Sequence, residues 1–289
     1  MTDFDTAGTA LLLHRLAEAS SGLVSLDPGI SDAQMDAWPV PVPEEIRVLL
    51  RSVGGVRFTV TRSAVNGHTS HEHIDFAHPY NEGRYHGSDM SWYVDHAGGA
   101  GSHWFVHTDH GDGHVYVDVD GDTGAWGPLF RFWDATDTAR VAPSLPAWLH
   151  QVADCAFRAL AEAGAETAAG AEARAGATAG AEAGGGIETG PDGVATPAAT
   201  RAFGNRLAEH WLALDDRPPT VGTVTVPEAR AAADPVLREA AAGLPGDALL
   251  ADLRAVTGPA RVDFGLPVTC RYARRAGGTV LAATPWDGE

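Results

Sequence analysis

The stretch VPEEIRVLLRSVGGVRFTV (residues 42–60) decides the fold class, because its apolar residues change from helical to strand spacing within it. Pro43 suits a first helical turn, and the two glutamates that follow it favour the positive end of a helix. The apolar face of this helix recurs at i, i+3, i+4 and i+7 and consists of Ile46, Leu49, Leu50 and Val53. Gly54-Gly55 ends the helix, and residues 56–60 then alternate with the period of a strand.

Shorter elements of both kinds flank this pair. Upstream, a first helix that stops near Gly22 has a leucine face made by Leu11, Leu12, Leu13 and Leu16, and Ser31 fits the N-cap of a short helix over residues 32–38. Downstream, β-branched and aromatic residues predict strands at residues 73–76, 103–107, 114–119 and 129–133. The turn sequences between them are Asn66-Gly67, Gly111-Asp112-Gly113 and Asp120-Gly121-Asp122, and Ser144 caps a closing helix. This order predicts an α+β fold with an antiparallel sheet flanked by helices.

Composition divides the chain into three segments. Residues 1–160 hold the elements above, and residues 161–200 consist almost entirely of Ala, Gly, Glu and Thr, which predicts a flexible linker with little stable helix. Residues 201–289 predict a small α+β module of no recognised family, with helices near residues 203–214 and 228–242 and strands near residues 223–226, 268–272 and 279–282. The net charges of the three segments are −12, −5 and −1.

The charged residues exclude several functions. The chain of 289 residues has a net charge of −18, and all 20 of its basic residues are arginine. Without lysine, neither a Walker phosphate loop nor Schiff-base chemistry can operate. The acidic balance disfavours nucleic acid as a ligand and favours a basic partner. No apolar stretch reaches the ~20 residues of a membrane span, and the N-terminus is acidic, so we expect a cytoplasmic protein with no membrane partner. Cys155 and Cys270 form no CxxC pattern, and we expect both thiols to be reduced.

Three stretches in a fixed order carry a family resemblance. They are residues 42–55, the segment WFVHTDHGDGHVYVD (residues 104–118), and GPLFRFW (residues 127–133) followed by VAPSL (residues 141–145) leading into Trp148-Leu149. Together they resemble the SUKH superfamily, the Smi/Knr-type domains of fungal cell-wall-assembly regulators and bacterial toxin-immunity proteins. The resemblance implies a protein-binding domain without catalysis or cofactor. Its bacterial members bind and neutralise a toxin, often a nuclease or a deaminase.

An acidic rim is the candidate partner-binding site. The turns that follow two of the expected strands carry carboxylates, and we expect the binding residues to be Asp109, Asp112, Asp118, Asp120, Asp122 and Trp126. A calcium loop counted from Asp118 has Thr123 at position six and Leu129 at position twelve, where an EF-hand needs Gly and Glu. These aspartates are therefore interpreted as turn residues that also offer negative charge to a basic partner.

Ten of the 13 histidines lie between His68 and His114, which leaves a metal site as the alternative. His71, His73 and Asp75 would lie on one face of a strand, so a histidine-coordinated metal protein or a metallohydrolase is conceivable. No HExxH helix motif occurs, and solvent-facing or hydrogen-bonded histidines explain the cluster as well. A second alternative is a regulatory scaffold whose two ends bring partners together through the linker.

Overall fold

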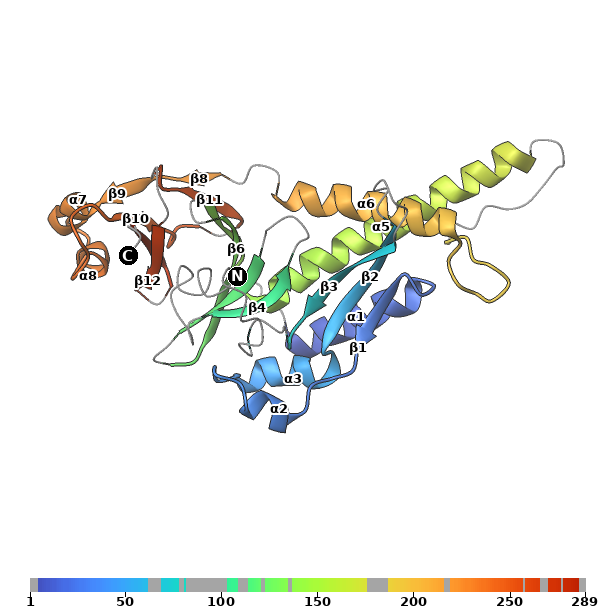
Figure 1. Cartoon of the computed structure of the whole chain (residues 1–289), viewed down its shortest axis with the longest axis horizontal. Coiled ribbons are helices and arrows are strands. Elements are labelled where there is room, and N and C mark those ends of the chain that lie inside the picture. The colour runs from blue at the N-terminus through green and yellow to red at the C-terminus, as the bar shows by residue number, and fades with distance from the viewer. Residues whose placement is uncertain are drawn as a thin grey trace. The chain divides into compact units, whose positions relative to one another are not determined.

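The computed structural model places helices and strands throughout the chain (Figure 1). It describes residues 5–61, 69–77, 81, 103–108, 114–120, 123–134, 137–175, 187–215, 219–256, 258–265, 270–276 and 278–285. The architecture is α+β with antiparallel sheets and flanking helices, as predicted. Among the described residues, no helix is both long enough and apolar enough to cross a bilayer.

Two compact units make up the chain, and their boundaries differ from the composition boundaries. Unit 1 comprises Met1–Ile30, Val48–Asp75 and Leu149–Asp216, and unit 2 comprises Ser31–Arg47, Phe76–Trp148 and Arg217–Glu289. The C-terminal segment expected to form a module of its own is thus shared between the two units. Each unit is assembled from three stretches of chain that lie far apart in the sequence.

Unit 1 contains a three-stranded antiparallel sheet in the order β1-β2-β3. Its strands are β1 (Val24–Asp27), β2 (Gly55–Thr61) and β3 (Thr69–Asp75). Its helices are α1 (Thr6–Ala19), most of α5 (Leu145–Ala175) and α6 (Pro197–Asp215). Phe58 of β2 is fully buried and meets Trp211 of α6 edge to face, with ring centroids 5.9 Å apart. One face of the sheet is therefore covered by helix, and the other carries polar side chains.

The helices begin where the capping residues predicted. The Ser31 hydroxyl accepts a hydrogen bond from the backbone amide of Gln34, and the Gln34 side-chain oxygen accepts one from the backbone amide of Ser31. Helix α2 (Asp32–Asp36) therefore starts with a capping box. Helix α3 (Glu44–Ser52) starts directly after Pro43. The predicted apolar face of α3, with Ile46, Leu49, Leu50 and Val53, is buried. These predictions are confirmed.

The main sheet of unit 2 has the order β4-β5-β6-β7-β11-β8. Its strands are β4 (His103–Thr108), β5 (His114–Val119), β6 (Trp126–Asp134), β7 (Asp137–Ala142), β11 (Ala260–Asp263) and β8 (Thr220–Val221). Strand β11 pairs antiparallel with β7, and β8 adds parallel to β11. This pairing places the C-terminal residues in the same sheet as the predicted meander.

A second sheet of unit 2 comes entirely from the C-terminal residues. Its order is β12-β13-β10-β9, with β12 (Cys270–Arg275), β13 (Val280–Pro285), β10 (Leu249–Asp252) and β9 (Thr223–Thr225). The single helix expected near residues 228–242 is instead two helices, α7 (Val226–Ala231) and α8 (Pro235–Ala240). The break falls at Asp234-Pro235, because the Asp234 side chain caps a new helix and proline cannot continue the old one.

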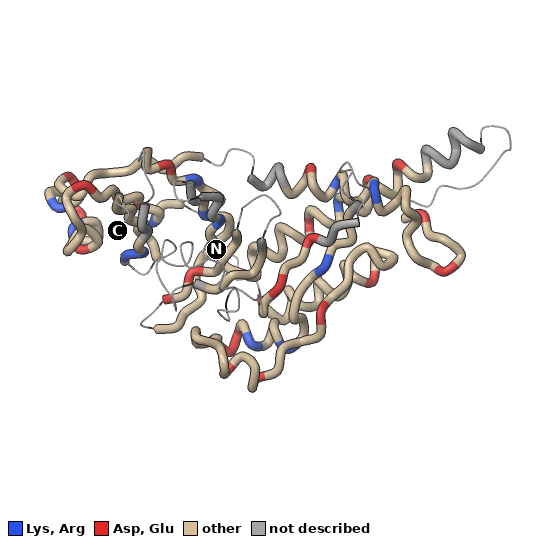
Figure 2. Tube along the Cα trace, viewed as in Figure 1, with Lys and Arg blue, Asp and Glu red and all other residues tan. Residues whose placement is uncertain are grey.

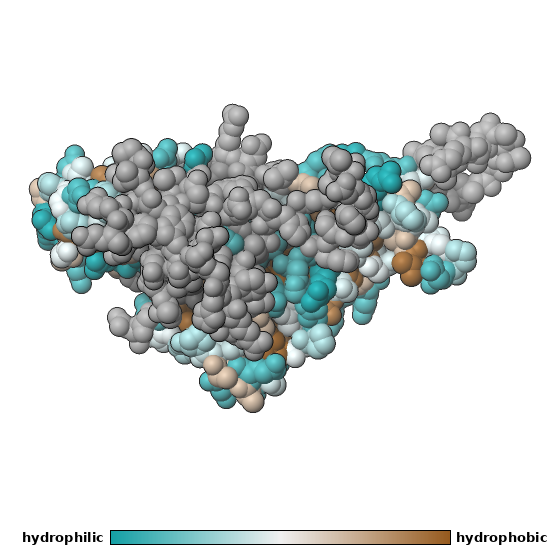
Figure 3. Space-filling view, viewed as in Figure 1, coloured by the Kyte–Doolittle hydropathy of each residue, from teal (hydrophilic) through white to brown (hydrophobic). Residues whose placement is uncertain are grey.

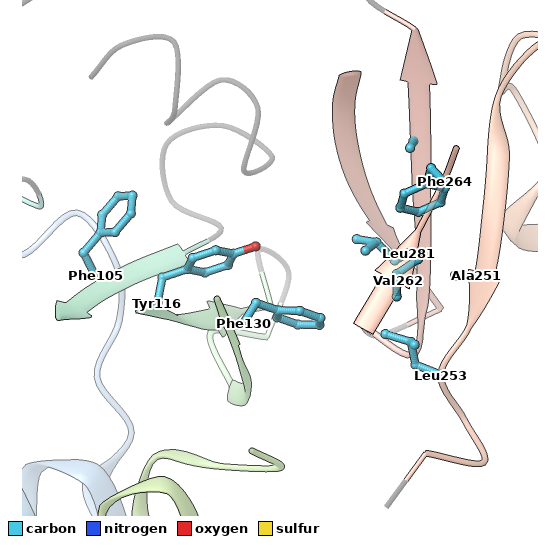
Figure 4. Close-up of a cluster of buried hydrophobic side chains, with 9 residues drawn as sticks. Phe105, Tyr116, Phe130, Ala251, Leu253, Val262, Phe264 and Leu281 are labelled. Carbon is cyan, nitrogen blue, oxygen red and sulfur yellow. The ribbon is translucent and has the colours of Figure 1, made fainter. Parts of the chain in front are cut away.

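The two sheets of unit 2 share one apolar core (Figure 4). The main sheet contributes Phe105, Tyr116 and Phe130, and the second sheet contributes Ala251, Leu253, Leu281 and Ala283, with Val262 and Phe264 completing the cluster. The opposite face of the main sheet is covered near His107 by Trp148, at a ring distance of 6.4 Å. Strand β5 is consequently buried along its whole length.

The alanine-rich segment is more ordered than predicted. Helix α5 continues from Leu145 to Ala175, so the first part of the expected linker is helical. High alanine propensity favours this extension. Arg206 of α6 adds cross-helix ion pairs to Glu162 and Glu166 of α5. The expectation of a linker with little stable helix is therefore wrong for residues 161–175, and residues 176–186 lie outside the described part of the chain.

Candidate partner-binding site

A tight turn links β5 to β6 and forms one part of the candidate site. The Asp120 side chain accepts hydrogen bonds from the amide and the hydroxyl of Thr123 at 2.7 and 2.8 Å. The Gly124 amide donates to the Asp120 carbonyl at 2.7 Å, and Gly124 has a φ of +72° that suits glycine. Asp120 therefore shapes its turn, as predicted for the aspartates of these loops.

Three tryptophans join this turn to the segment between α2 and α3. The Trp126 indole donates a hydrogen bond to the Pro41 carbonyl at 2.9 Å, and its ring lies 6.2 Å from that of Trp104. Trp104 is buried, donates its indole N–H to the Phe76 carbonyl at 2.8 Å and stacks on Trp38. Trp38 and Trp126 remain half-exposed. The cluster thus has one buried ring between two rings that reach the surface.

Acidic side chains on α2 and α3 precede and follow the segment that holds Trp38 and Pro41. Asp32 and Asp36 are exposed on α2, and Glu44 and Glu45 are exposed in the first turn of α3. Arg47 lies among them, 2.6 Å from Asp36 and 3.4 Å from Asp32, and donates to the Val42 carbonyl. Figure 2 shows both acidic and basic residues in the α2–α3 region. We call the surface formed by Asp32, Asp36, Trp38, Glu44, Glu45, Asp120 and Trp126 the acidic-tryptophan rim.

The structure places the predicted partner-binding residues in different environments. Asp120 and Trp126 lie on the acidic-tryptophan rim, while Asp109, Asp112 and Asp122 lie outside the described residues. The prediction that Asp118 binds a partner is wrong, because its side chain is buried and forms an ion pair with Arg274 of β12. A carboxylate enclosed in this way cannot meet a partner at the surface. Trp38 and the acidic residues of α2 and α3 were missed, since only the fold brings them beside β6.

The residues of the alternative metal site lie in unit 1. His71, His73 and Asp75 occupy alternate positions of β3, opposite Thr59, Arg57 and Gly55 of β2. The His73 Nε2 atom lies 2.6 Å from Asp27 Oδ2 on β1, and the side chain of His71 lies outside the described part of the structure. In the described residues there is no group of three or more His, Cys, Asp or Glu side chains placed to hold a metal ion.

Asp27 instead organises a cluster across three strands. It accepts hydrogen bonds from Arg57 Nε at 2.7 Å and interacts with His73. Burial alone would raise the pKa of Asp27, but the hydrogen bonds of Arg57 and His73 outweigh it and hold the pKa below its usual value. Gly55 makes the approach possible, because a Cβ atom there would lie 2.6 Å from Asp27 Oδ2. These contacts explain His73 as part of a hydrogen-bonded cluster in the sheet.

Two further histidines and one cysteine are buried in the protein interior. His107 and His114 are buried on β4 and β5, where His114 lies 5.9 Å from the Phe105 ring. Cys155 is a buried thiol that donates to the His210 carbonyl at 3.6 Å. The Ser144 hydroxyl accepts a long hydrogen bond from the Ala147 amide at the start of α5, consistent with the predicted N-cap.

Comparison with known proteins finds no matching family model, no similar curated protein and no matching solved structure. The functional argument therefore rests on the residues and the geometry of this chain.

Proposed function

We propose that this chain is a non-catalytic, cytoplasmic protein-binding module that resembles SUKH-type immunity proteins and neutralises a basic partner, such as a nuclease or deaminase toxin. The observation that carries the proposal is the acidic-tryptophan rim, in which half-exposed Trp38 follows α2 and half-exposed Trp126 bonds to Pro41, in the segment between the exposed carboxylates of α2 and those of α3.

The order of elements supports the resemblance on which the proposal draws. Helices α1 to α3 precede the strands β2 to β7, and α5 follows them, as expected from the three motif stretches. The proline-flanked helix, the strand pair around residues 104–118 and the closing helix after Ser144 all form at the positions where the motifs place them.

Burial supports the choice of the rim as the contact surface. Strand β5 is buried along its length, with the second sheet packed on its Tyr116 side, and Trp148 lies 6.4 Å from His107 on the neighbouring strand β4. Strand β5 therefore offers no contact surface, and the proposal places the contact on the acidic-tryptophan rim instead. In the view of Figure 3 the described surface is mostly hydrophilic, with small separate hydrophobic areas, which suits a polar contact with a few aromatic anchors.

The chemistry of the rim fits arginine and lysine side chains. A guanidinium or ammonium group can lie over the exposed face of Trp38 or Trp126 and pair with a nearby carboxylate, and each cation–π contact contributes about 0.5–2 kcal/mol. Complementary charge would also speed association and make it sensitive to salt. The clefts of enzymes that act on nucleic acids carry such cations.

A pair of matched variants tests the proposal. Asp36→Asn with Glu45→Gln removes two exposed charges from the rim, and Glu18→Gln with Asp154→Asn removes two exposed charges from unit 1. The full chain and both variants are incubated with basic nucleases and deaminases encoded beside its gene, and inhibition of each enzyme is measured against salt concentration. We expect the wild type and the unit 1 variant to inhibit one enzyme at low salt and the rim variant to inhibit it at least ~10-fold less. Equal inhibition by all three proteins would contradict the rim, and inhibition of none would contradict the neutralising function.

A further inference from the structure

One arginine of this chain already occupies part of the acidic-tryptophan rim. The guanidinium of Arg47 on α3 lies 2.6 Å from Asp36 and 3.4 Å from Asp32 on α2, and its Nε atom donates to the Val42 carbonyl at 3.0 Å. The Arg47 side chain is 17% exposed, whereas those of Asp32 and Asp36 are 54% and 66% exposed. A cation of the chain itself is thus bound to two of the carboxylates that a basic partner would meet.

The charge of Arg47 opposes the binding of a second cation at this place. Residues 31–47 contain four of the five acidic residues of the rim and a single basic residue, Arg47, which brings the net charge of the segment from −4 to −3. An arginine keeps its proton at every pH that a protein meets, so this positive charge is permanent. By Coulomb's law it weakens the attraction of Asp32 and Asp36 for any other cation nearby.

Contacts that do not involve Arg47 hold the rim in place. Helix α2 starts with a capping box of its own, and the ring of Trp38, which follows it, stacks on that of Trp104. The Pro41 carbonyl accepts the indole N–H of Trp126, which ties the segment between α2 and α3 to β6. Removal of the Arg47 charge should therefore leave the rim carboxylates in position and change mainly how strongly they attract a cation.

We propose that Arg47 is an internal competitor of the basic partner, and that it lowers the affinity of the acidic-tryptophan rim by occupying Asp32 and Asp36. The inference rests on the proposed function, because it takes the rim as the contact surface. It adds the kind of partner that the rim selects. A protein with one or two scattered cations meets carboxylates that are already paired, whereas a dense cluster of arginines or lysines also engages the rest of the rim.

Competition and positioning predict opposite effects of a neutral side chain at residue 47. If Arg47 positioned the α2 carboxylates for a partner, its loss would weaken binding, whereas the loss of a competitor strengthens it. A unit charge about 7 Å from a second one in water changes an affinity by about threefold. Arg47→Lys separates charge from geometry, because lysine keeps the charge but replaces the planar fork of donors by a single nitrogen.

Binding of an octa-arginine peptide to the full chain, measured by titration calorimetry, tests the inference. At low salt we expect Arg47→Gln and Arg47→Met to bind the peptide about threefold more tightly than the wild type, and Arg47→Lys to change the affinity by less than about twofold. The gain should disappear at about 0.5 M salt, which screens exposed charges. Arg15→Gln removes an exposed arginine of α1 in unit 1 and is the matched control for net charge, with an expected change below about 1.5-fold.

The rim variant, Asp36→Asn with Glu45→Gln, separates failure of the inference from failure of the proposed function. If this variant binds the peptide less tightly but Arg47→Gln does not bind it more tightly, the inference is overturned and the rim remains the contact surface. Equal gains in Arg47→Gln and Arg15→Gln would also overturn the inference, because net charge alone would explain them. Wild-type affinity in the rim variant would contradict the rim itself, and both proposals with it.

Urea titration followed by circular dichroism shows which variants are folded. Arg47→Met keeps a side chain of similar length without the charge, so it replaces Arg47→Gln in the comparison if the latter does not fold. Loss of the fold in both neutral variants would show that Arg47 is needed to position the rim, and would overturn the inference.

Discussion

The ring of Trp38 stacks on the ring of Trp104, with centroids 4.1 Å apart and planes inclined by 27°. Trp38 follows α2, and Trp104 lies near the start of β4. This contact fixes the chain between α2 and α3 against the main sheet of unit 2, and the Trp126–Pro41 hydrogen bond holds the same segment from the other side. The acidic side chains of the rim depend on this attachment for their position.

Removal of the buried ring should therefore destabilise the protein strongly. We expect Trp104→Ala to lower the free energy of unfolding by about 3–5 kcal/mol, because it leaves a large cavity and an orphaned Phe76 carbonyl. Half-exposed Trp38→Ala should cost about 1–2 kcal/mol. Urea titration followed by circular dichroism measures both. Leu11→Ala is the control, because this side chain is 53% exposed, and it should change the free energy of unfolding by less than ~0.5 kcal/mol. Equal urea midpoints for Trp104→Ala and Leu11→Ala would contradict the prediction.

The Asp27 cluster should make unit 1 sensitive to acid. Because the pKa of Asp27 in the fold lies below its ordinary value, its contribution is present above pH ~4 and is lost as pH falls through the lowered pKa. We expect Asp27→Asn to be less stable than the wild type at pH 6 and to lose less stability between pH 5 and pH 2. Hydrogen exchange of peptides from unit 1, measured at several pH values, gives the stability of unit 1 in each protein. Stability that falls equally with pH in the wild type and in Asp27→Asn would contradict the prediction.

Gly55 should tolerate no side chain. Its missing Cβ leaves room for Asp27 to reach His73, so Gly55→Ala should force these groups apart and lower stability by about 1–3 kcal/mol. Gly246→Ala is the matched control, since nothing lies within 4 Å of a Cβ atom there. Equal unfolding midpoints for the two variants would show that the strands shift without cost.

Truncation should reveal that the C-terminal residues are part of unit 2. A chain ending at residue 216 lacks β11 and the whole second sheet, which exposes Phe105, Tyr116 and Phe130. We expect it to bind the dye ANS, to aggregate and to lose protection in β4 to β6, because a large apolar face meets water. A soluble truncated chain with native protection in these strands would instead favour an independent N-terminal domain.

Metal analysis addresses the histidine-rich segment as a whole. Because His73 is engaged by Asp27 and the proposed protein-binding function needs no metal, we expect purified protein to hold less than ~0.1 transition-metal ion per chain by elemental analysis. About one zinc or iron per chain, removed by a chelator and lost in His71→Ala, would favour the metal-binding alternative over a protein-binding module.

Local sequence signals predicted the elements that have strong caps or periods. Ser31 with Gln34, Pro43 with its acidic neighbours, and the apolar face of α3 each act within a few residues, so their outcome needs no distant partner. The short strands β1, β7 and β11 were missed because four to six residues of mixed polarity carry too little pattern. Of the rim, Asp120 and Trp126 were predicted, whereas Trp38 was not.

The amino-acid order alone determined the α+β class, the starts of α2 and α3, the turn at Asp120 and the acidic net charge. Only the tertiary structure decided that β11 pairs with β7, that the second sheet covers the Tyr116 face, and that Asp118 meets Arg274. Capping and periodicity are interactions between near neighbours and can be seen in any window of the chain. Pairing between residues more than a hundred positions apart depends on which apolar faces fit together, and no local pattern encodes that choice.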